Sequence, residues 1–236
     1  MATEKILLGL TTTPESDWRE KINEINKYKI KEIALFPTYL EAKKRKELYA
    51  LLENSCVEKI PHVHLRDDME SWEISYFYQK YQTRLFNVHP RKKDFELIKN
   101  SPEYHKNIFV ENTFSIDRDF TDIVKLSEGI CFDVSHFHSS AILMKEKSYR
   151  KLIDLFKTHK IGCCHISAIL QKSYKVESYI TKKMLTTYSS HYLYNLNEVD
   201  YVKEYLQYLP QTISIELENS FQEQIAIKKH LEKFLL

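Results

Sequence analysis

The feature that most constrains the fold of this chain is a regular alternation of short apolar runs with longer charged stretches. Eight runs are short and rich in β-branched residues, which is typical of buried strands. They are Lys5–Thr11, Glu32–Phe36, Ile60–Leu65, Arg84–His89, Asn107–Asn112, Gly129–Val134, Lys160–Ile166 and Gln211–Leu217. Apolar residues recur at helical spacing in the stretches Asp17–Tyr28, Glu41–Glu53, Glu70–Tyr81, Ser148–Thr158 and Asn197–Tyr208. Because strands that alternate with helices pair in parallel, we expect an α/β fold, a closed (β/α)8 barrel, with an open doubly wound sheet as the alternative.

Length and composition favour one globular domain over residues 1–236. Hydrophobic residues make up 43% and charged residues 29% of the chain, which is the balance of a globular protein with a packed core. The formal net charge of +2 lacks the strong positive charge of a dedicated nucleic-acid binder, although it does not exclude DNA. Only three glycines occur, so a glycine-rich phosphate loop is excluded.

The sequence also predicts a cytoplasmic protein without a membrane partner. The apolar run Ile6–Leu10 is too short for a signal-peptide core or a membrane span. The four cysteines contain no C-x-x-C pair, and at least three lie in apolar segments where a thiol packs as a small hydrophobic group.

Ionisable residues stand at the carboxyl ends of successive predicted strands, where the active sites of β/α barrels are built. They are His89, Glu111, Asp133, His165 and Glu216. Each follows an apolar residue, and all but Glu111 are also followed by one, so alternation turns the side chain away from the helices and into the barrel. A buried carboxylate must be paired or bound to metal, and carboxylates with imidazoles are typical ligands of Mn, Zn or Co. Any one of these residues alone fits a core histidine or a buried ion pair equally well, but the set favours a divalent-metal site.

The remaining histidines are expected to play lesser roles. His62 shares a strand face with His64, and we expect one of the two to be structural. Three others, His105, His159 and His230, lie beside lysines or at the opposite end of the barrel and are expected at the surface.

This arrangement resembles the xylose isomerase-like TIM barrels, a superfamily that includes sugar phosphate isomerases and epimerases and the endonuclease IV group of DNA-repair enzymes. The most specific piece is Asp133-x-x-His136, framed by Glu111, His165 and Glu216. In the epimerase branch, the resemblance implies a metal held by Glu111, Asp133, His165 and Glu216. In the endonuclease branch, which uses three zinc ions, it implies the additional ligands His64, His89, His136 and His191.

The chain departs from both branches at particular residues. The endonuclease pattern has an acid two residues before its last histidine, where this chain has Ser189, and a glycine where it has Arg91. The epimerase pattern has a basic residue soon after the histidine of the seventh strand, where this chain has Ser167-Ala168-Ile169-Leu170. The two departures from the endonuclease pattern argue against a third ion and, with it, against phosphodiester cleavage.

Three functions follow from the resemblance. The first is a sugar or sugar-phosphate isomerase or epimerase, in which Glu111 and Glu216 act as base and acid through an enediolate and His136 orients a substrate hydroxyl. The alternative is a zinc-dependent endonuclease for abasic sites, with nucleic acid as its partner. A further alternative is a non-catalytic binding barrel. The resemblance also implies a possible homo-oligomer.

The segment Ala168–Leu196 is too long for an ordinary loop of this fold, and we expect it to form a mobile lid over the barrel mouth. Its lysines would offer positive charge to a phosphorylated substrate, although a solvated loop is the simpler interpretation. They are Lys172, Lys175, Lys182 and Lys183.

Overall fold

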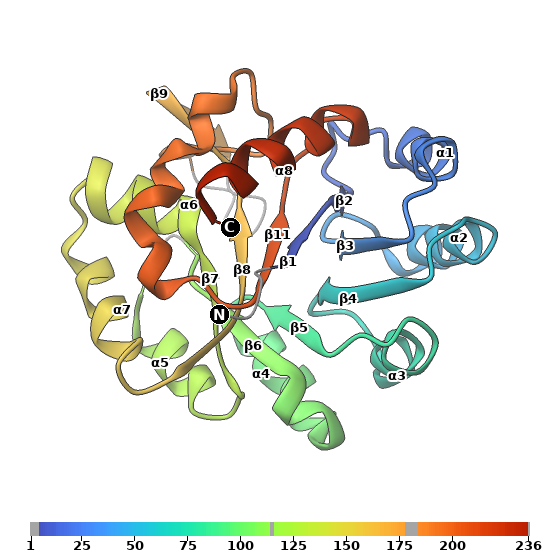
Figure 1. Ribbon diagram of the computed structural model, residues 1–236. Helices are drawn as coiled ribbons and strands as arrows, with labels where there is room; N and C mark the ends of the chain where they lie inside the picture. Colours follow the sequence, from blue (N-terminus) through green and yellow to red (C-terminus); the bar gives the residue numbers. More distant parts are fainter. Residues whose placement is uncertain (1–4, 114–115, 178–183, 236) are drawn as a thin grey trace.

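The computed structural model describes residues 5–113, 116–177 and 184–235. In these residues nine strand segments form one parallel sheet, in the order β1-β11-β8-β7-β6-β5-β4-β3-β2, which curls into a nearly closed barrel (Figure 1). Their bounds are β1 Lys5–Leu7, β2 Gly9–Thr11, β3 Glu32–Phe36, β4 Lys59–His64, β5 Leu85–Val88, β6 Ile108–Glu111, β7 Gly129–Asp133, β8 Lys160–Ile166 and β11 Thr212–Ile215. The predicted α/β barrel is confirmed.

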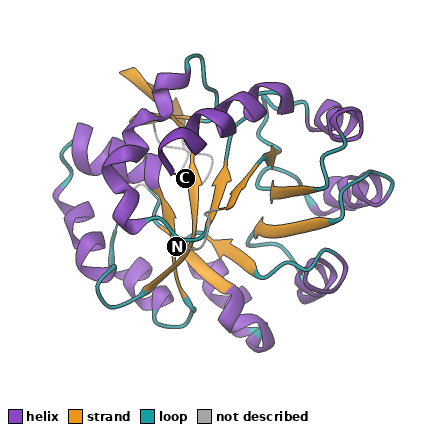
Figure 2. Cartoon of the chain, viewed as in Figure 1, coloured by secondary structure: helices purple, strands orange, loops and turns teal. Residues whose placement is uncertain are grey.

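Helices surround the barrel and cover its outer face, as Figure 2 shows in purple around the orange strands. The α-helices are α1 Trp18–Tyr28, α2 Ala42–Glu53, α3 Ser71–Lys80, α4 Lys92–Lys99, α5 Arg118–Val124, α6 Val134–Phe137, α7 Arg150–Leu155 and α8 Phe221–Leu235. Other helical turns are η1 Pro102–Asn107, η2 His138–Leu143 (a π-helix), η3 Lys147–Tyr149 and η4 Leu196–Tyr208. The stretch predicted as helical over Asn197–Tyr208 is thus a 3-10 helix.

The first predicted strand is interrupted, and the interruption closes the barrel. The segment β1 pairs with β11, whereas β2 pairs with β3, so the two halves of Lys5–Thr11 belong to opposite edges of the sheet. Gly9 stands at this seam, where an added Cβ would lie 1.9 Å from the carbonyl oxygen of Ile215. Gln224 of α8 bridges the seam, because its amide accepts from the Gly9 N–H at 2.8 Å and donates to the Gly9 carbonyl at 2.9 Å. The prediction of one continuous strand was therefore wrong at Leu8.

Alternation along the strands separates the main core from the lumen of the barrel. Residues such as Ile33, Leu35 and Val110 belong to the large apolar cluster between strands and helices. The lumen holds two small clusters, which are Leu7 with Ala34 and Phe36, and Phe109 with Cys131 and Cys163. Fully burying an aliphatic or aromatic side chain is worth about 1.5–3 kcal/mol, so the outer core dominates the stability of the fold. Beside these two clusters, the lumen contains polar groups such as His62, Asn87 and Ser214.

The insertion after β8 is a two-stranded antiparallel ribbon of β9 (Ala168–Glu177) and β10 (Met184–Ser190). The chain thus returns along itself immediately after β8, and most of the segment expected to form a lid lies in paired strands. Lys172 and Lys175 are exposed on β9, and Lys182 and Lys183 lie outside the described residues. That the ribbon moves as a lid stays a prediction.

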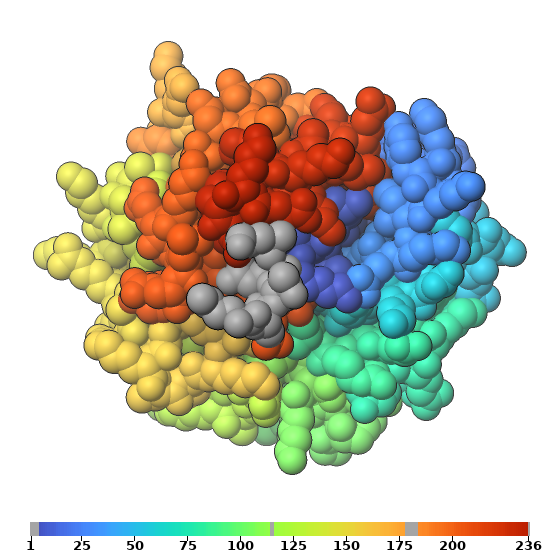
Figure 3. Space-filling model, viewed as in Figure 1, coloured from blue at the N-terminus to red at the C-terminus, as the bar shows by residue number. Residues whose placement is uncertain are grey.

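Helix α8 joins the end of the chain to its beginning. Figure 3 shows α8, in red, beside the blue helix α1. Glu24 of α1 accepts the backbone N–H of Phe221 at 2.7 Å, and Tyr28 donates its hydroxyl to Gln222 at 2.9 Å. Among the described residues, none of the helices combines the length and the apolar character that a membrane span requires.

Candidate metal centre

The residues singled out from the sequence meet at the carboxyl end of the barrel. His64, Glu111 and Asp133 are the last residues of β4, β6 and β7, and His165 is the penultimate residue of β8. His89 and Glu216 directly follow β5 and β11. Because residues two apart share a strand face, each of these side chains stands directly above a lumen residue of the same strand.

One group of side chains surrounds the Nδ1 atom of His165. This atom lies 3.1 Å from Glu216 Oε2, 3.4 Å from Glu111 Oε2 and 3.9 Å from Asp133 Oδ2. All four residues are buried, and the ligand atoms of Asp133, His165 and Glu216 lie within 4.8 Å of one another. The structure therefore brings together the four residues that the epimerase branch implies. That they bind an ion stays a prediction.

A second group shares Glu111 with the first. His64 Nε2 lies 3.0 Å from Glu111 Oε2, and His89 Nε2 lies 3.7 Å from Glu111 Oε1. The two imidazoles also face each other, with 3.3 Å between their Nε2 atoms. The ligand atoms of His64, His89 and Glu111 likewise lie within 4.8 Å of one another. Glu111 thus stands between two sets of metal-ligating side chains.

His136 and His191 lie at the rim of the first group. His136 Nε2 is 3.7 Å from Asp133 Oδ2, and His136 forms a further possible ligand group with Glu111 and Asp133. His191 Nδ1 is 4.0 Å from Glu216 Oε1, and its side chain is 35% exposed. Within residues 5–113, 116–177 and 184–235, no group of three that would suit an ion includes His191.

Ser189 has taken a structural role in place of the acid that the endonuclease pattern expects. Its hydroxyl is buried and donates to Ser135 Oγ at 3.2 Å. Ser135 donates in turn to Asp133 Oδ1 at 2.6 Å, and the backbone N–H of His136 donates to the same oxygen at 2.7 Å. These bonds hold one oxygen of Asp133 and leave Oδ2 facing the cluster.

The electrostatics of the cluster are those of carboxylates neutralised by histidines. Burial alone lowers the pKa of His165, but the carboxylates of Glu111, Glu216 and Asp133 raise it to about 10. Burial raises the pKa of Glu216, but the charge and hydrogen bond of His165 lower it to about 2. Burial lowers the pKa of His89 to about 3, so this imidazole is neutral. In the metal-free protein His165 is therefore a protonated imidazolium surrounded by the three carboxylates.

Other carboxylates of the cluster shift in opposite directions. Burial would raise the pKa of Glu111, but His165, His89 and His64 hold it well below its usual range. Burial raises the pKa of Asp133, and the neighbouring Glu111 adds to this effect against the opposing charge of His136. Of the three carboxyl groups around His165, Asp133 is thus the one whose negative charge the neighbouring histidines stabilise least.

Unsatisfied polar atoms show that the donor set fits a divalent cation. Buried atoms of this region that make no hydrogen bond include Asp133 Oδ2, His89 Nδ1 and His191 Nδ1, whereas His165 Nδ1 has only the surrounding carboxylates as partners. Each such atom costs about 1–3 kcal/mol if nothing binds it. Imidazole nitrogens and carboxylate oxygens suit Zn, Mn or Co, so bound cations would satisfy the atoms that face the cluster.

The sequence analysis missed a lower layer of polar side chains that touch the ligands from below. Asn87 donates its amide N–H to Glu111 Oε2 at 2.7 Å. Cys131 Sγ lies 3.4 Å from His165 Nε2, the nitrogen that faces away from the carboxylates. Each residue stands two positions before a candidate ligand of its own strand, Asn87 before His89 and Cys131 before Asp133, so it shares the strand face of that ligand.

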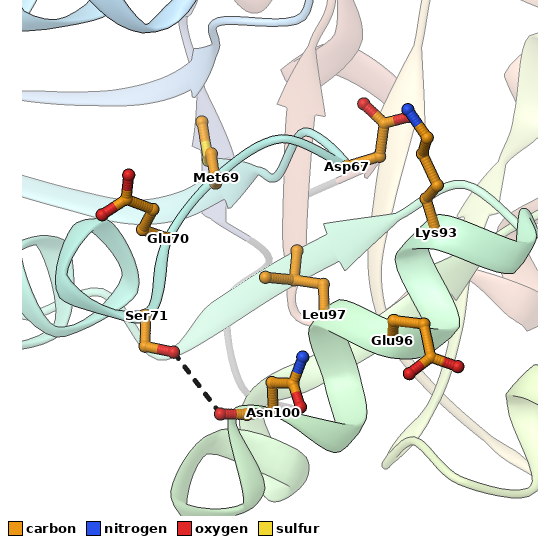
Figure 4. Close-up of a pocket in the computed structure, with 8 residues that line it drawn as sticks. All are labelled: Asp67, Met69, Glu70, Ser71, Lys93, Glu96, Leu97 and Asn100. Carbon is orange, nitrogen blue, oxygen red and sulfur yellow. Dashed lines mark hydrogen bonds between the residues drawn. The ribbon is translucent and has the colours of Figure 1, made fainter.

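A pocket on the flank of the barrel is separate from this cluster (Figure 4). It lies between the start of α3 and the length of α4, and Ser71 donates to the carbonyl of Asn100 at 3.4 Å. Its lining residues are Asp67, Met69, Glu70, Ser71, Lys93, Glu96, Leu97 and Asn100. None of them belongs to the two ligand groups, and we assign the pocket no role in the chemistry.

Comparisons with known proteins find similarity of fold only. No family model matches the chain, and no curated protein matches it. Among solved structures, a xylose isomerase-like TIM barrel protein from Mycobacterium smegmatis in complex with magnesium is 9% identical, with 99% of this chain and 98% of that chain covered and a TM-score of 0.47. A truncated 3-deoxy-D-arabino-heptulosonate 7-phosphate synthase from Thermotoga maritima is 10% identical, with 98% and 86% covered and a TM-score of 0.49. The first is a barrel of the kind that the sequence resembles.

Proposed function

We propose that this chain is a divalent-metal-dependent enzyme that hydrolyses phosphoesters with a two-ion centre. The observation that carries the proposal is the position of Glu111 between the His64–His89 pair and the group of Asp133, His165 and Glu216. A carboxylate shared by two sets of ligands is suited to bridge two ions. Enzymes with paired ions include phosphatases, nucleases and polymerases.

The proposal assigns metal-binding roles to the buried residues and substrate-binding roles to the rim histidines. One ion would be held by His64, His89 and Glu111, and the other by Glu111, Asp133, His165 and Glu216. When bound, paired divalent ions supply charge that stabilises the attacking and leaving oxygens of a phosphoryl group. The rim histidines His136 and His191 are placed to donate hydrogen bonds to phosphoryl oxygens, and His136 to transfer a proton to a departing oxygen.

The isomerase or epimerase is the second candidate, and one observation favours it. Glu111, Asp133, His165 and Glu216 converge without the help of His64 or His89, so a single ion would find a complete site. The substrate would then be a sugar or sugar phosphate. Glu111 and Glu216 would exchange protons with adjacent carbons, and His136 would orient a hydroxyl.

Metal stoichiometry with a substrate panel separates the candidates. The proposal expects two ions per chain by plasma mass spectrometry and hydrolysis of bis(p-nitrophenyl) phosphate, p-nitrophenyl phosphate or an abasic-site duplex. The double variant His64→Gln/His89→Gln should lose one ion and the hydrolysis, while the matched control His159→Gln keeps both. One ion per chain with turnover of keto-sugar phosphates would support the isomerase. No bound ion would reject both.

A further inference from the structure

The lower layer of the lumen contains a directed chain of hydrogen bonds that ends on Glu111. Ser214 Oγ lies 2.7 Å from His62 Nδ1, and His62 Nε2 lies 3.0 Å from Asn87 Oδ1. Asn87 Nδ2 then donates to Glu111 Oε2 at 2.7 Å. The three residues below Glu111 are 0% exposed, so water does not compete for these bonds.

The chemistry of the last bond fixes the direction of the bond between His62 and Asn87. A carboxylate only accepts hydrogen bonds, so the amide of Asn87 must turn its NH₂ group toward Glu111 and its oxygen toward His62. That oxygen accepts, so His62 must carry a proton on Nε2. In the tautomer with its single proton on Nε2, the Nδ1 atom of His62 accepts the hydroxyl proton of Ser214. Reversing the Asn87 amide would bring its oxygen against the Glu111 carboxylate and its NH₂ group against the His62 N–H.

We infer that His62 is a positioning residue, which fixes the Glu111 carboxylate between the two ligand groups by holding the amide of Asn87 in one orientation. The inference rests on the proposed function to the extent that Glu111 is a metal ligand. Partners behind metal ligands set ligand orientation and basicity, and losing one commonly costs about 10–100-fold in metal affinity. The sequence left open which of His62 and His64 is structural, and the bonds of His62 assign it that role.

The same geometry argues against His62 being a ligand itself. Its ring, together with Cys131 and His165, forms a group whose ligand atoms lie within 4.8 Å of one another. However, both nitrogens of His62 already have hydrogen-bond partners, and Cys131 Sγ faces His165 Nε2. Binding an ion there would break the bonds that organise the layer above.

The test compares Mn²⁺ affinity in three proteins by isothermal titration calorimetry. His62→Leu removes both bonds and should weaken Mn²⁺ binding by about 10–100-fold. His62→Gln supplies a donor for Asn87 and an acceptor for Ser214, so it should restore binding close to the wild-type value. Circular dichroism checks the fold of each variant. If His62→Leu does not fold, the nearly isosteric Asn87→Leu takes its place, with the same expected loss.

The outcomes separate this inference from the function on which it rests. Wild-type affinity in the Leu variant, or equal weakness in the Gln and Leu variants, would overturn the positioning role alone. An extra ion per wild-type chain that both His62→Gln and Cys131→Ala remove would show that these residues are ligands, which also overturns it. A wild-type chain that binds no Mn²⁺ would overturn the proposed function as well.

Discussion

Metal binding should release a proton from His165, and this release can be measured. In the metal-free protein the pKa of His165 is raised to about 10 by the buried carboxylates of Glu111, Glu216 and Asp133, against the lowering effect of burial. The imidazole is therefore charged at neutral pH. An ion that binds its Nδ1 atom must displace that proton, while Nε2 keeps its hydrogen toward Cys131 Sγ, 3.4 Å away.

The size of the effect follows from the pKa. Each pKa unit is worth about 1.4 kcal/mol, so removing the His165 proton at pH 7 reduces the free energy of metal binding by about 4 kcal/mol. The apparent metal affinity is then lower by roughly a thousandfold. The cost falls as pH rises toward 10. We therefore expect the apparent Mn²⁺ affinity of this group to increase about tenfold per pH unit between pH 7 and pH 9.

Calorimetry in buffers of different ionisation enthalpy counts the protons. The wild type should release about one proton more per chain than His165→Gln, whose amide cannot be protonated. His159→Gln, at the opposite end of the same strand region, should behave like the wild type. Equal proton release in all three proteins, with an affinity for Mn²⁺ that does not change with pH, would refute the assignment of His165 as a charged ligand residue.

Four further outcomes are expected. The metal-free fold should lose stability as pH rises, because the folded-state pKa of His165 is above its ordinary value. The stabilisation from protonated His165 is complete below about pH 6.5 and is lost as the pH passes through about 10, which a falling Tm would show. Glu216→Gln should lower turnover by about 10²–10⁴-fold with an unchanged circular dichroism spectrum, whereas Glu218→Gln should leave most activity. Arg45→Leu should lower the free energy of unfolding by about 3–5 kcal/mol in urea titrations, because it leaves the buried Glu73 carboxylate, which Arg45 binds at 2.8 and 2.9 Å, without its partner. The control Arg19→Leu, which breaks an exposed ion pair with Glu47, should lower it by less than about 1 kcal/mol. Gly9→Ala should cost about 1–3 kcal/mol by the same measurement, because its Cβ would meet the Ile215 carbonyl at the barrel seam.

The strands and the ligand residues were predictable because their signals are local. Glu111 stands beside Val110 at the end of an apolar run, and Asp133 follows Phe132, so alternation alone turns both carboxylates into the lumen. Charge in an apolar context is costly unless it is bound, which made these residues conspicuous. The same reasoning failed for Asn87, which lies between Phe86 and Val88, because a neutral amide gives no comparable signal of function.

Other parts of the structure depend on contacts between distant residues. The break at Leu8 exists because the first strand must pair with β11 at one end and with β3 at the other, and only barrel closure imposes that demand. The ribbon of β9 and β10 carries Gln171, Lys172 and Ser173 rather than an apolar alternation, so its strands are defined by pairing with each other. Neither feature is marked in the local sequence.

Ser189 offers a test of why the chain would hold two ions rather than three. Its hydroxyl donates to Ser135, which supports Asp133, and Asp133 already has a pKa raised by burial and by Glu111. A carboxylate at this buried position must be protonated, paired or bound to a cation. Because His136 and His191 lie at the rim of the same group, we expect Ser189→Asp to bind one ion more than the wild type, measured by plasma mass spectrometry, while the uncharged Ser189→Asn binds the wild-type number. An unchanged ion count in both variants, with lower stability in Ser189→Asp alone, would show that the added carboxylate stays uncompensated and that the two rim histidines do not share a metal site.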